Sequence, residues 1–434
     1  MIIQPDWLVA SSEEVSANTA VRVLDGVITH VAPPGELVAL FPEDETVDGS
    51  GCALLPGFVN SHVHLYGTLA HGIVIESPPT GFESFLDDYW WPQVEDRLDQ
   101  QMIGAATEWV CAEMLRSGTT TFFDICEAPG ALSGVLEVEA EYASRAGMRG
   151  IFSFEATERS GQEIAERSLC ENLDFIDAHQ SDPLVSGAMS WHTVFTCSPQ
   201  FIERAADEAR ARSTWYHAHC NEGTHEGNWA RENHGMDTMA FYRELGVANQ
   251  SFLASQCVQM TDSELDIIAA TGTRVSHMPL SNCEVGGGIA PIAELLAKGV
   301  TVGLGTDGYV NDMYEVMRGA FWLQKARLLD PSTLPAHDVL HMATEGGART
   351  LGIDNLGRIE PGWIADLQLV KSNLPTPIDA STICDQLVLW RSGQHVRDVM
   401  VAGEWRVRNG EVLGVDVERA RGRVVEEASR LWGR

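Results

Sequence analysis

Three segments of the sequence end an apolar run in a side chain that can bind a metal ion. His62 and His64 end the run that begins at Phe58, His219 ends a second run, and Asp307 ends a third. On a strand, residues two apart point to the same side, so His62 and His64 can reach one ion. A single His-x-His pair indicates little by itself. Three strand-like runs that end in the same way predict one metal site.

The predicted ligands are three imidazoles and one carboxylate, contributed by His62, His64, His219 and Asp307. This nitrogen-rich set with one hard oxygen suits a single Zn²⁺ ion, and Fe²⁺ or Mn²⁺ accept the same ligand types. An ion with an open coordination position lowers the pKa of bound water from 15.7 toward about 7. The expected chemistry is therefore hydrolysis by metal-bound hydroxide.

Glu222 lies three residues beyond His219, where the predicted strand turns into a loop. A carboxylate there can lean over the substrate, take a proton from water and pass it to a leaving amine, as hydrolytic deamination requires. Taken singly, His219 could be a core histidine with satisfied hydrogen bonds and Glu222 a solvated loop charge. Together with the other three ligands, the metal interpretation is the stronger one.

The middle of the chain alternates short apolar runs with longer amphipathic ones. Eight runs read as strands: Phe58 to His64, Thr119 to Ile125, Arg149 to Phe154, Val185 to Thr196, Thr214 to Cys220, Ser251 to Val258, Thr273 to Met278 and Val300 to Thr306. Eight strand and helix repeats predict an α/β fold, a closed (β/α)8 TIM-type barrel whose strands end at one catalytic face. A doubly wound sheet is the alternative, but no Gly-x-Gly-x-x-Gly turn follows the first strand.

The two ends of the chain have a different pattern. Residues 21–31 form a predicted hairpin with an Asp-Gly turn, and residues 403–412 form another with Asn-Gly. We expect the ends to meet in one small β-sandwich domain, made of residues 1–56 and 356–434, beside a barrel of residues 57–355. Residues 417–432 space their apolar side chains helically, which predicts a C-terminal surface helix.

The composition is strongly acidic, with 62 acidic and 29 basic residues, three of them lysines, and a formal net charge of -33. This charge argues against nucleic acid or an anionic membrane surface as a partner. It suits a halophilic, high-salt cytoplasm, and the alternative is an ordinary acidic protein from an arginine-biased genome. The nine cysteines are scattered, and no apolar run spans a bilayer, so we expect a reduced, cytoplasmic protein.

Several motifs resemble those of the amidohydrolase superfamily. They are Pro56 to His64, Arg116 to Asp124, His219-x-x-Glu222, Ser276 to Asn282, Gly303 to Gly308, Gly357 to Leu367 and Val399 to Gly403. The sequence is similar to the branch of triazine hydrolases, chlorohydrolases and S-adenosylhomocysteine deaminases, including SsnA-like aminohydrolases. The likeness covers essentially the whole chain, and its motifs are specific for the branch but weak on substrate.

The resemblance implies roles for individual residues. His62, His64, His219 and Asp307 would hold one divalent ion, usually zinc. Glu222 would be the proton shuttle, and Asp307 would also accept the proton of water. His192, which follows the fourth strand, matches a histidine that often contacts substrate; the alternative is a loop histidine bonded to the backbone. Related proteins are often dimers or larger, so a homodimer or larger homo-oligomer is expected.

Two positions depart from the branch. Gln256 stands where relatives carry a histidine at the end of the sixth strand. It can donate an N–H to an oxyanion but cannot carry a proton away. His277, at the end of the seventh strand, could take over part of this catalytic role or be purely structural. His71 stands where the branch often has arginine and is predicted to contact substrate, the alternative being a solvent-facing side chain.

The sequence thus predicts a metal-dependent hydrolase that acts on a C–N bond of a small nitrogen-rich heterocycle, most simply by hydrolytic deamination. Trp90, Trp91 and Phe195 could form flat walls for such a ring. One alternative is hydrolysis of a cyclic amide or removal of a halide at the same site. Another is an inactive metal-holding binding protein, which Gln256 favours and the retained Glu222 and Asp307 oppose.

Overall fold

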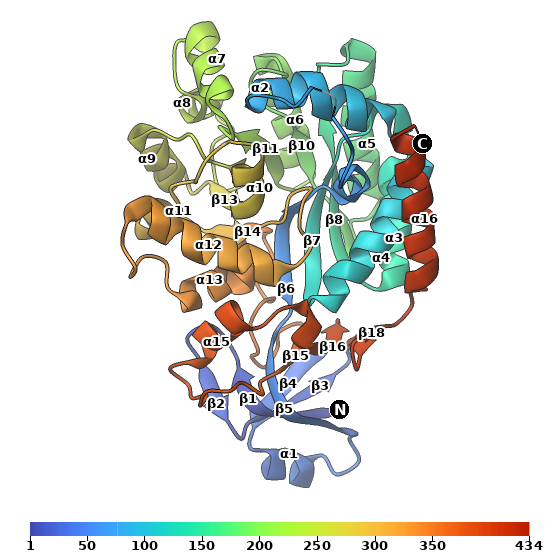
Figure 1. Cartoon of the computed structure of the whole chain (residues 1–434), viewed down its shortest axis with the longest axis vertical. Coiled ribbons are helices and arrows are strands. Elements are labelled where there is room, and N and C mark those ends of the chain that lie inside the picture. Colours follow the sequence, from blue (N-terminus) through green and yellow to red (C-terminus); the bar gives the residue numbers. More distant parts are fainter. Residues whose placement is uncertain (76, 434) are drawn as a thin grey trace.

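The computed structural model describes residues 1–75 and 77–433, and its larger part is a parallel β-barrel (Figure 1). Its strands pair in the order β14-β13-β12-β11-β10-β8-β7-β6, with β9 beside β8. Their bounds are β6 (Phe58–Val63), β7 (Thr119–Cys126), β8 (Arg149–Ala156), β9 (Val185–Gly187), β10 (Met189–Trp191), β11 (Tyr216–Cys220), β12 (Phe252–Gln256), β13 (Arg274–His277) and β14 (Val302–Leu304). The predicted barrel is confirmed, and β9 and β10 share the fourth predicted run.

The barrel closes between its last strand and its first. The backbone nitrogens of Thr306 and Asp307 both donate to the carbonyl oxygen of His62, at 3.0 and 3.1 Å. The side chain of Asn60 strengthens the same seam, because it donates to Thr306 Oγ1 at 2.7 Å and accepts from Thr306 N at 3.1 Å. Two predicted metal ligands, His62 and Asp307, therefore lie on the strand ends that form the seam.

Helices cover the outside of the barrel. The predicted helical stretches correspond to α3 (Gln100–Arg116), α4 (Val135–Ala146), α5 (Gln162–Ala178), α6 (Pro199–Ala211), α8 (Thr238–Glu244), α9 (Asp262–Thr271), α11 (Ile292–Ala297) and α12 (Met313–Leu328). Four helices beyond this pattern are α7 (Thr224–His234), α10 (Pro279–Glu284), α13 (Ala336–Ala343) and α14 (Glu345–Thr350). Of these, α7 and α10 follow the strands that carry His219 and His277, so they help to build the barrel mouth.

A segment between the first strand and α3 covers the mouth of the barrel. It consists of α2 (Phe82–Ser84), the wide-turned helix η2 (Phe85–Val94) and the short η3 (Glu95–Arg97), after η1 (Leu65–Ala70). In Figure 1 α2 lies at the upper end of the barrel, opposite the sheet formed by the chain ends. Phe82, Phe85 and Trp90 of this segment line the cavity described below, so the mouth has an aromatic cover.

Both chain ends contribute to one mixed sheet, with strand order β18-β17-β16-β15-β5-β1-β3-β4 and β2 beside β1. The strands are β1 (Ile2–Val9), β2 (Val15–Ala17), β3 (Ala20–Leu24), β4 (Val27–Ala32), β5 (Thr46–Pro56), β15 (Leu367–Lys371), β16 (Val396–Val401), β17 (Glu404–Arg408) and β18 (Glu411–Val412). β15 pairs antiparallel with β5, which joins the two ends. The predicted meeting of the ends is thus confirmed, while the exact domain boundaries stay a prediction.

The hairpin turns follow the predicted chemistry. Asp25 and Gly26 have φ of 51° and 79°, and Asn409 and Gly410 have 52° and 81°, the left-handed pair that a two-residue hairpin turn requires. Smaller helices α1 (Pro34–Leu40) and α15 (Ile383–Trp390) flank the sheet. The C-terminal helix α16 (Val417–Leu431) packs on the barrel helix α3, as Figure 1 shows in red.

Two further features concern the whole described chain. No helix among residues 1–75 and 77–433 is long and apolar enough to cross a membrane. All nine cysteines are unpaired, seven of them buried, as expected for small apolar core side chains.

The seam between β14 and β6 leaves no room for an extra methyl group at Gly305. A Cβ there would lie 2.7 Å from the His62 carbonyl oxygen and 2.9 Å from its Cβ. We expect Gly305→Ala to destabilise the protein by about 1–3 kcal/mol, as overpacking does. Denaturant unfolding measures this. The matched control is Gly422→Ala in α16, where a Cβ meets no atom within 4 Å; equal effects of the two substitutions would contradict the crowding argument.

Candidate metal centre and active site

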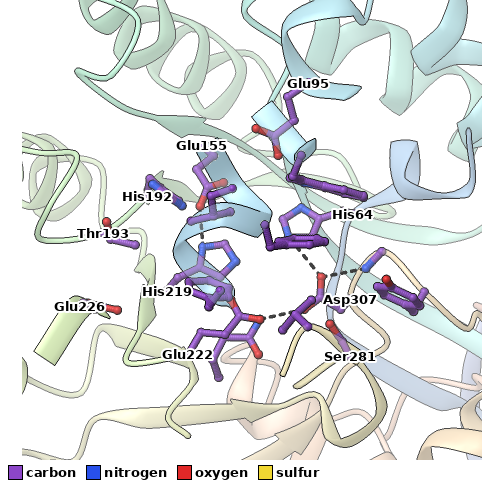
Figure 2. A pocket seen from close by; sticks show the side chains of 18 residues that line it. His64, Glu95, Glu155, His192, Thr193, His219, Glu222, Glu226, Ser281 and Asp307 are labelled. Carbon is purple, nitrogen blue, oxygen red and sulfur yellow. Dashed lines mark hydrogen bonds and ion pairs between the residues drawn. The ribbon is translucent and has the colours of Figure 1, made fainter. Parts of the chain in front are cut away.

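Three imidazole rings converge at the carboxyl ends of the barrel strands. His62 and His64 come from the end of β6 and His219 from β11, and all three are buried. The Nε2 atoms of His62 and His64 are 3.3 Å apart, and the candidate donor atoms of the three residues lie within 4.8 Å of one another. Asp307 Oδ1 lies 3.5 Å from His64 Nε2, as Figure 2 shows. The four predicted ligands therefore meet at one point.

The hydrogen bonds behind the rings fix which nitrogens face this point. His64 Nδ1 donates to the carbonyl oxygen of Ile125 at 2.6 Å, so its Nε2 carries the lone pair. His219 Nδ1 lies 2.6 Å from Glu155 Oε1, close enough for that carboxylate to favour the proton on Nδ1, although the pair is not aligned as a hydrogen bond. Carboxylate or carbonyl partners behind the rings are typical of metal-bound histidines.

The electrostatics of the cluster also fit a cation. Burial, with the neighbouring imidazoles, lowers the pKa of His62 well below its usual value, and burial lowers the pKa of His219 to about 4. These rings are therefore neutral electron-pair donors at pH 7, the form in which histidine binds metal. A divalent ion bound here would accept a lone pair from each ring nitrogen that faces it. The donor set therefore fits one divalent ion.

Asp307 is held in its position from two sides. Gly308 N donates to Oδ1 and Gln256 Nε2 donates to Oδ2, both at 2.8 Å. Burial raises the pKa of Asp307, but the His64 ring and these hydrogen bonds outweigh it and keep the pKa below its usual value. Asp307 is thus a carboxylate over the whole neutral pH range.

Three residues at strand ends of the site have a left-handed backbone. They are Asn221 after β11, Gln256 at the end of β12 and Asp307 after β14, with φ of 49°, 71° and 58°. Non-glycine residues rarely adopt this conformation, and it concentrates at functional sites. At all three positions it turns the chain sharply where the strand gives way to its loop.

Three of the predicted ligands, His64, His219 and Asp307, line a cavity at the mouth of the barrel. Glu222 lies in its wall, in the loop between β11 and α7, and is largely buried. Burial, followed by the charges of Asp307 and Glu226, raises the pKa of Glu222 well above its usual value. A carboxyl group with a raised pKa beside the ligands can both take and return a proton near neutral pH.

The structure brings some of the other predicted residues to the cavity and leaves others outside it. His192 and Gln256 line it, as does Trp90. His192 Nδ1 is bonded to the side chain of Thr196 at 2.8 Å, not to the backbone. Gln256 also accepts a hydrogen bond from Asn282, so its amide is held at both ends. The catalytic and substrate-contact roles of these residues stay predictions.

Four predicted residues lie elsewhere. His277 is buried at the end of β13 but does not line the cavity, and neither of its ring nitrogens has a hydrogen-bond partner among the described residues. Trp91 and Phe195 line a second cavity, which shares Leu86 with the first. His71 is exposed and bonds the carbonyl oxygen of Gly308 at 2.8 Å, outside both cavities. It lines a separate hollow together with Glu113 and Tyr309, and its contact with substrate stays a prediction.

Sequence reasoning misses Glu155, Glu95 and Glu226, which also line the cavity. Glu155 directly follows the apolar run that ends at Phe154, so the rule that finds His219 and Asp307 could have found it. No such signal exists for Glu95, which lies in the irregular segment over the mouth, or for Glu226, in the first turn of the unpredicted α7.

Comparison with known proteins identifies the family. Residues 53–406 match the model of the amidohydrolase family. The chain belongs to that family. This confirms the resemblance seen in the motifs and, with the histidine cluster, the prediction of a metal-dependent hydrolase of the aminohydrolase type.

Two relatives of known name align with nearly the whole chain. The protein is 35% identical to the 5'-deoxyadenosine deaminase of Methanothermobacter thermautotrophicus, over 90% of this chain and 88% of the relative. It is 32% identical to the 5-methylthioadenosine/S-adenosylhomocysteine deaminase of Haloarcula marismortui, over 99% and 96%.

Solved structures show the same architecture. A zinc-containing adenosine deaminase from Xanthomonas campestris superimposes with a TM-score of 0.90 at 26% identity, covering 100% of this chain and 98% of that one. An atrazine chlorohydrolase from Arthrobacter aurescens TC1, complexed with zinc, gives 0.85 at 22% identity, covering 98% and 99%. At that identity the second likeness shows the fold alone.

The contact between Glu155 and His219 generates a prediction about metal affinity. Glu155→Gln removes the carboxylate behind the ring, so we expect a roughly 10–100-fold weaker affinity for a divalent ion. Titration against a competing chelator measures this, with His64→Ala as the variant that should lose the ion. Glu163→Gln, an exposed position at the start of α5, is the matched control. An affinity of Glu155→Gln equal to that of the control would show that the contact does not support the ligand.

Proposed function

We propose that the protein removes the exocyclic amine of a small nitrogen-rich ring as ammonia, with adenine nucleosides as the first candidates. The observation that carries this proposal is the position of Glu222, a buried carboxyl group with a raised pKa in the same cavity wall as His64, His219 and Asp307. Relatives with 30–35% identity that are named deaminases of adenine nucleosides support the choice of substrate.

We infer that the resident metal is one Zn²⁺ ion, held by His62, His64, His219 and Asp307. Three neutral imidazoles and one carboxylate are a donor set that zinc prefers, and the structure of the adenosine deaminase named above contains zinc. When bound there, such an ion lowers the pKa of water and so supplies a nucleophile at neutral pH.

The residues of the chain then divide the proton transfers. Asp307, an ionised carboxylate, accepts the proton of the attacking water while Gln256 holds it in place. Glu222 gives a proton to the ring nitrogen, takes up the second proton of the attacking water and passes it to the departing amine. The proton held by Asp307 then returns to Glu222, which restores both groups. Trp90, at the cavity wall, offers a flat apolar surface to the ring. His192, whose pKa burial lowers well below its usual value, is a neutral hydrogen-bonding group for the substrate.

The alternative reactions have less support. Dehalogenation is the reaction of the atrazine chlorohydrolase, which shares only the fold with this chain. An inactive binding protein has no use for a buried shuttle beside the ligands, and Glu222 is in place. Ammonia release from an adenine nucleoside would distinguish deamination from both alternatives.

The proton shuttle gives the first test. Glu222→Gln keeps the size of the side chain but cannot carry a proton, so we expect ammonia release to fall by about 100-fold or more. Metal content should stay unchanged, because Glu222 is not a ligand. Glu232→Gln, exposed on α7, is the matched control and should keep full activity. Full activity of Glu222→Gln would refute the assignment of the shuttle.

We further propose that the protein is adapted to a high-salt cytoplasm and acts as a homodimer or larger homo-oligomer. The formal net charge of -33 and the unpaired cysteines support the first part. Light scattering of the purified protein tests the second. Its substrate would be a small heterocycle, with neither nucleic acid nor a membrane as a partner.

The salt proposal has its own measurement. Because salt screens the repulsion among acidic groups, Tm should rise by several degrees between about 0.1 M and about 1 M NaCl. Sucrose stabilises folded proteins without screening charge and is the control. A Tm that rises equally in sucrose and in salt, or not at all in salt, would contradict halophilic adaptation.

A further inference from the structure

The cavity above the ligands is acidic throughout. Five carboxyl-bearing residues line it, and no described lining residue is lysine or arginine. The five are Glu95, Glu155, Glu222, Glu226 and Asp307, which Figure 2 shows on several sides of the same space. No basic side chain among the described lining residues is in place to hold an anionic substituent of a substrate.

The guanidinium group beside the cavity is already engaged. Arg159 donates through Nε to Glu127 at 2.5 Å, through Nη1 to Asp96 at 2.9 Å and through Nη2 to Glu95 at 3.2 Å. Its Cζ also lies 4.8 Å from the centre of the Trp91 ring. The guanidinium group of Arg159 is thus bonded to three acidic side chains. Its N–H donors are therefore not free to bind a phosphate or carboxylate of a ligand.

The second cavity, which shares Leu86 with the first, is also lined by several carboxyl groups, and the engaged Arg159 is its arginine. Glu83, Asp87 and Glu158 line it together with the rings of Trp91 and Phe195. Its other basic group, His225, lies 3.4 Å from Glu83. Carboxylates beside aromatic faces attract cations and hydrogen-bond donors and repel anions.

One buried acceptor in the first cavity has no partner within the protein. Glu226 is 2% exposed; its Oε2 accepts from Asn221 N at 2.5 Å, while its Oε1 has no hydrogen-bond partner among the described residues. A buried oxygen of this kind is costly unless it is paired. A hydroxyl or ammonium group of a ligand would satisfy it.

We propose that the substrate is a neutral or cationic heterocycle, and that the site rejects otherwise similar molecules with a phosphate or carboxylate on the part directed away from the reacting ring. This inference rests on the proposed deamination and specifies its substrate class. The carboxyl groups of the cavity walls would then discriminate between substrates by their charge. Asp87 of the second cavity would contribute to the rejection of anions.

The first experiment varies only the charge of the substrate. The zinc-loaded enzyme is assayed for ammonia release with adenosine-5'-carboxamide and adenosine-5'-carboxylate, which match in size, and with 5'-amino-5'-deoxyadenosine. Assays at about 1 M salt, where the Debye length is about 3 Å, suppress the long-range field of the acidic protein. We expect kcat/KM for the carboxylate to be about ten-fold or more below that for the carboxamide. For the amine, kcat/KM should be at least as high as for the carboxamide.

Equal kcat/KM for carboxylate and carboxamide would overturn the inference while leaving deamination intact. Release of ammonia from none of the three, nor from adenosine itself, would instead refute deamination of adenine nucleosides. The two failures are therefore distinguishable in one assay.

A pair of neighbouring substitutions locates the effect. Asp87 lines the second cavity, whereas Asp88, the next residue, lines a separate hollow. Both are exposed, and lysine at either position changes the charge equally. We expect Asp87→Lys to lower, several-fold, the ratio of kcat/KM for the carboxamide to kcat/KM for the carboxylate. Asp88→Lys should leave this ratio unchanged. Equal effects of the two substitutions on this ratio would show that discrimination depends on the total charge of the protein and not on the cavity wall.

Discussion

The site depends on the hydrogen bonds that close the barrel. The carbonyl oxygen of His62 accepts from both Thr306 and Asp307, so the peptide that carries one predicted ligand also fixes the backbone of another. Because β6 and β14 are the first and last strands of the barrel, residues about 240 positions apart meet only when the sheet is closed. Folding of the barrel and assembly of the ligand set are therefore one event. The crowding at Gly305, against His62, shows how little the seam can shift.

A second constraint acts from behind the ligands. The backbone carbonyl of Ile125 orients His64, and Glu155 lies against His219. Both partners come from strands adjacent to each other, β7 and β8, on one side of the cluster. Arg159 extends this support outward, since it joins Glu127 at the end of β7 to Glu95 and Asp96 over the mouth. The segment over the mouth and the residues behind the histidine ligands are thus joined by one polar network.

Much of this arrangement could be predicted from the sequence, for identifiable reasons. Strand ends of a parallel barrel share one face, so His62, His64, His219 and Asp307 could be placed together from their positions after apolar runs. Turn chemistry placed the hairpins at Asp25 and Asn409. The segment from Phe82 to Arg97 has no such regularity, because wide and narrow helical turns alternate in it. The side chains that it brings to the first cavity, and the placement of Trp91 in the wall of the second, depend on that geometry and could not be derived.

The left-handed backbone at Asn221, Gln256 and Asp307 has a consequence for how such a site can change. A position with positive φ admits asparagine, aspartate, histidine and glycine more readily than other residues, and it strongly disfavours valine, isoleucine and threonine. The range of side chains open to these three positions is therefore narrowed by the main chain before any ligand selects among them. Mutant libraries that respect this restriction would sample far fewer variants, and most of their members would still fold.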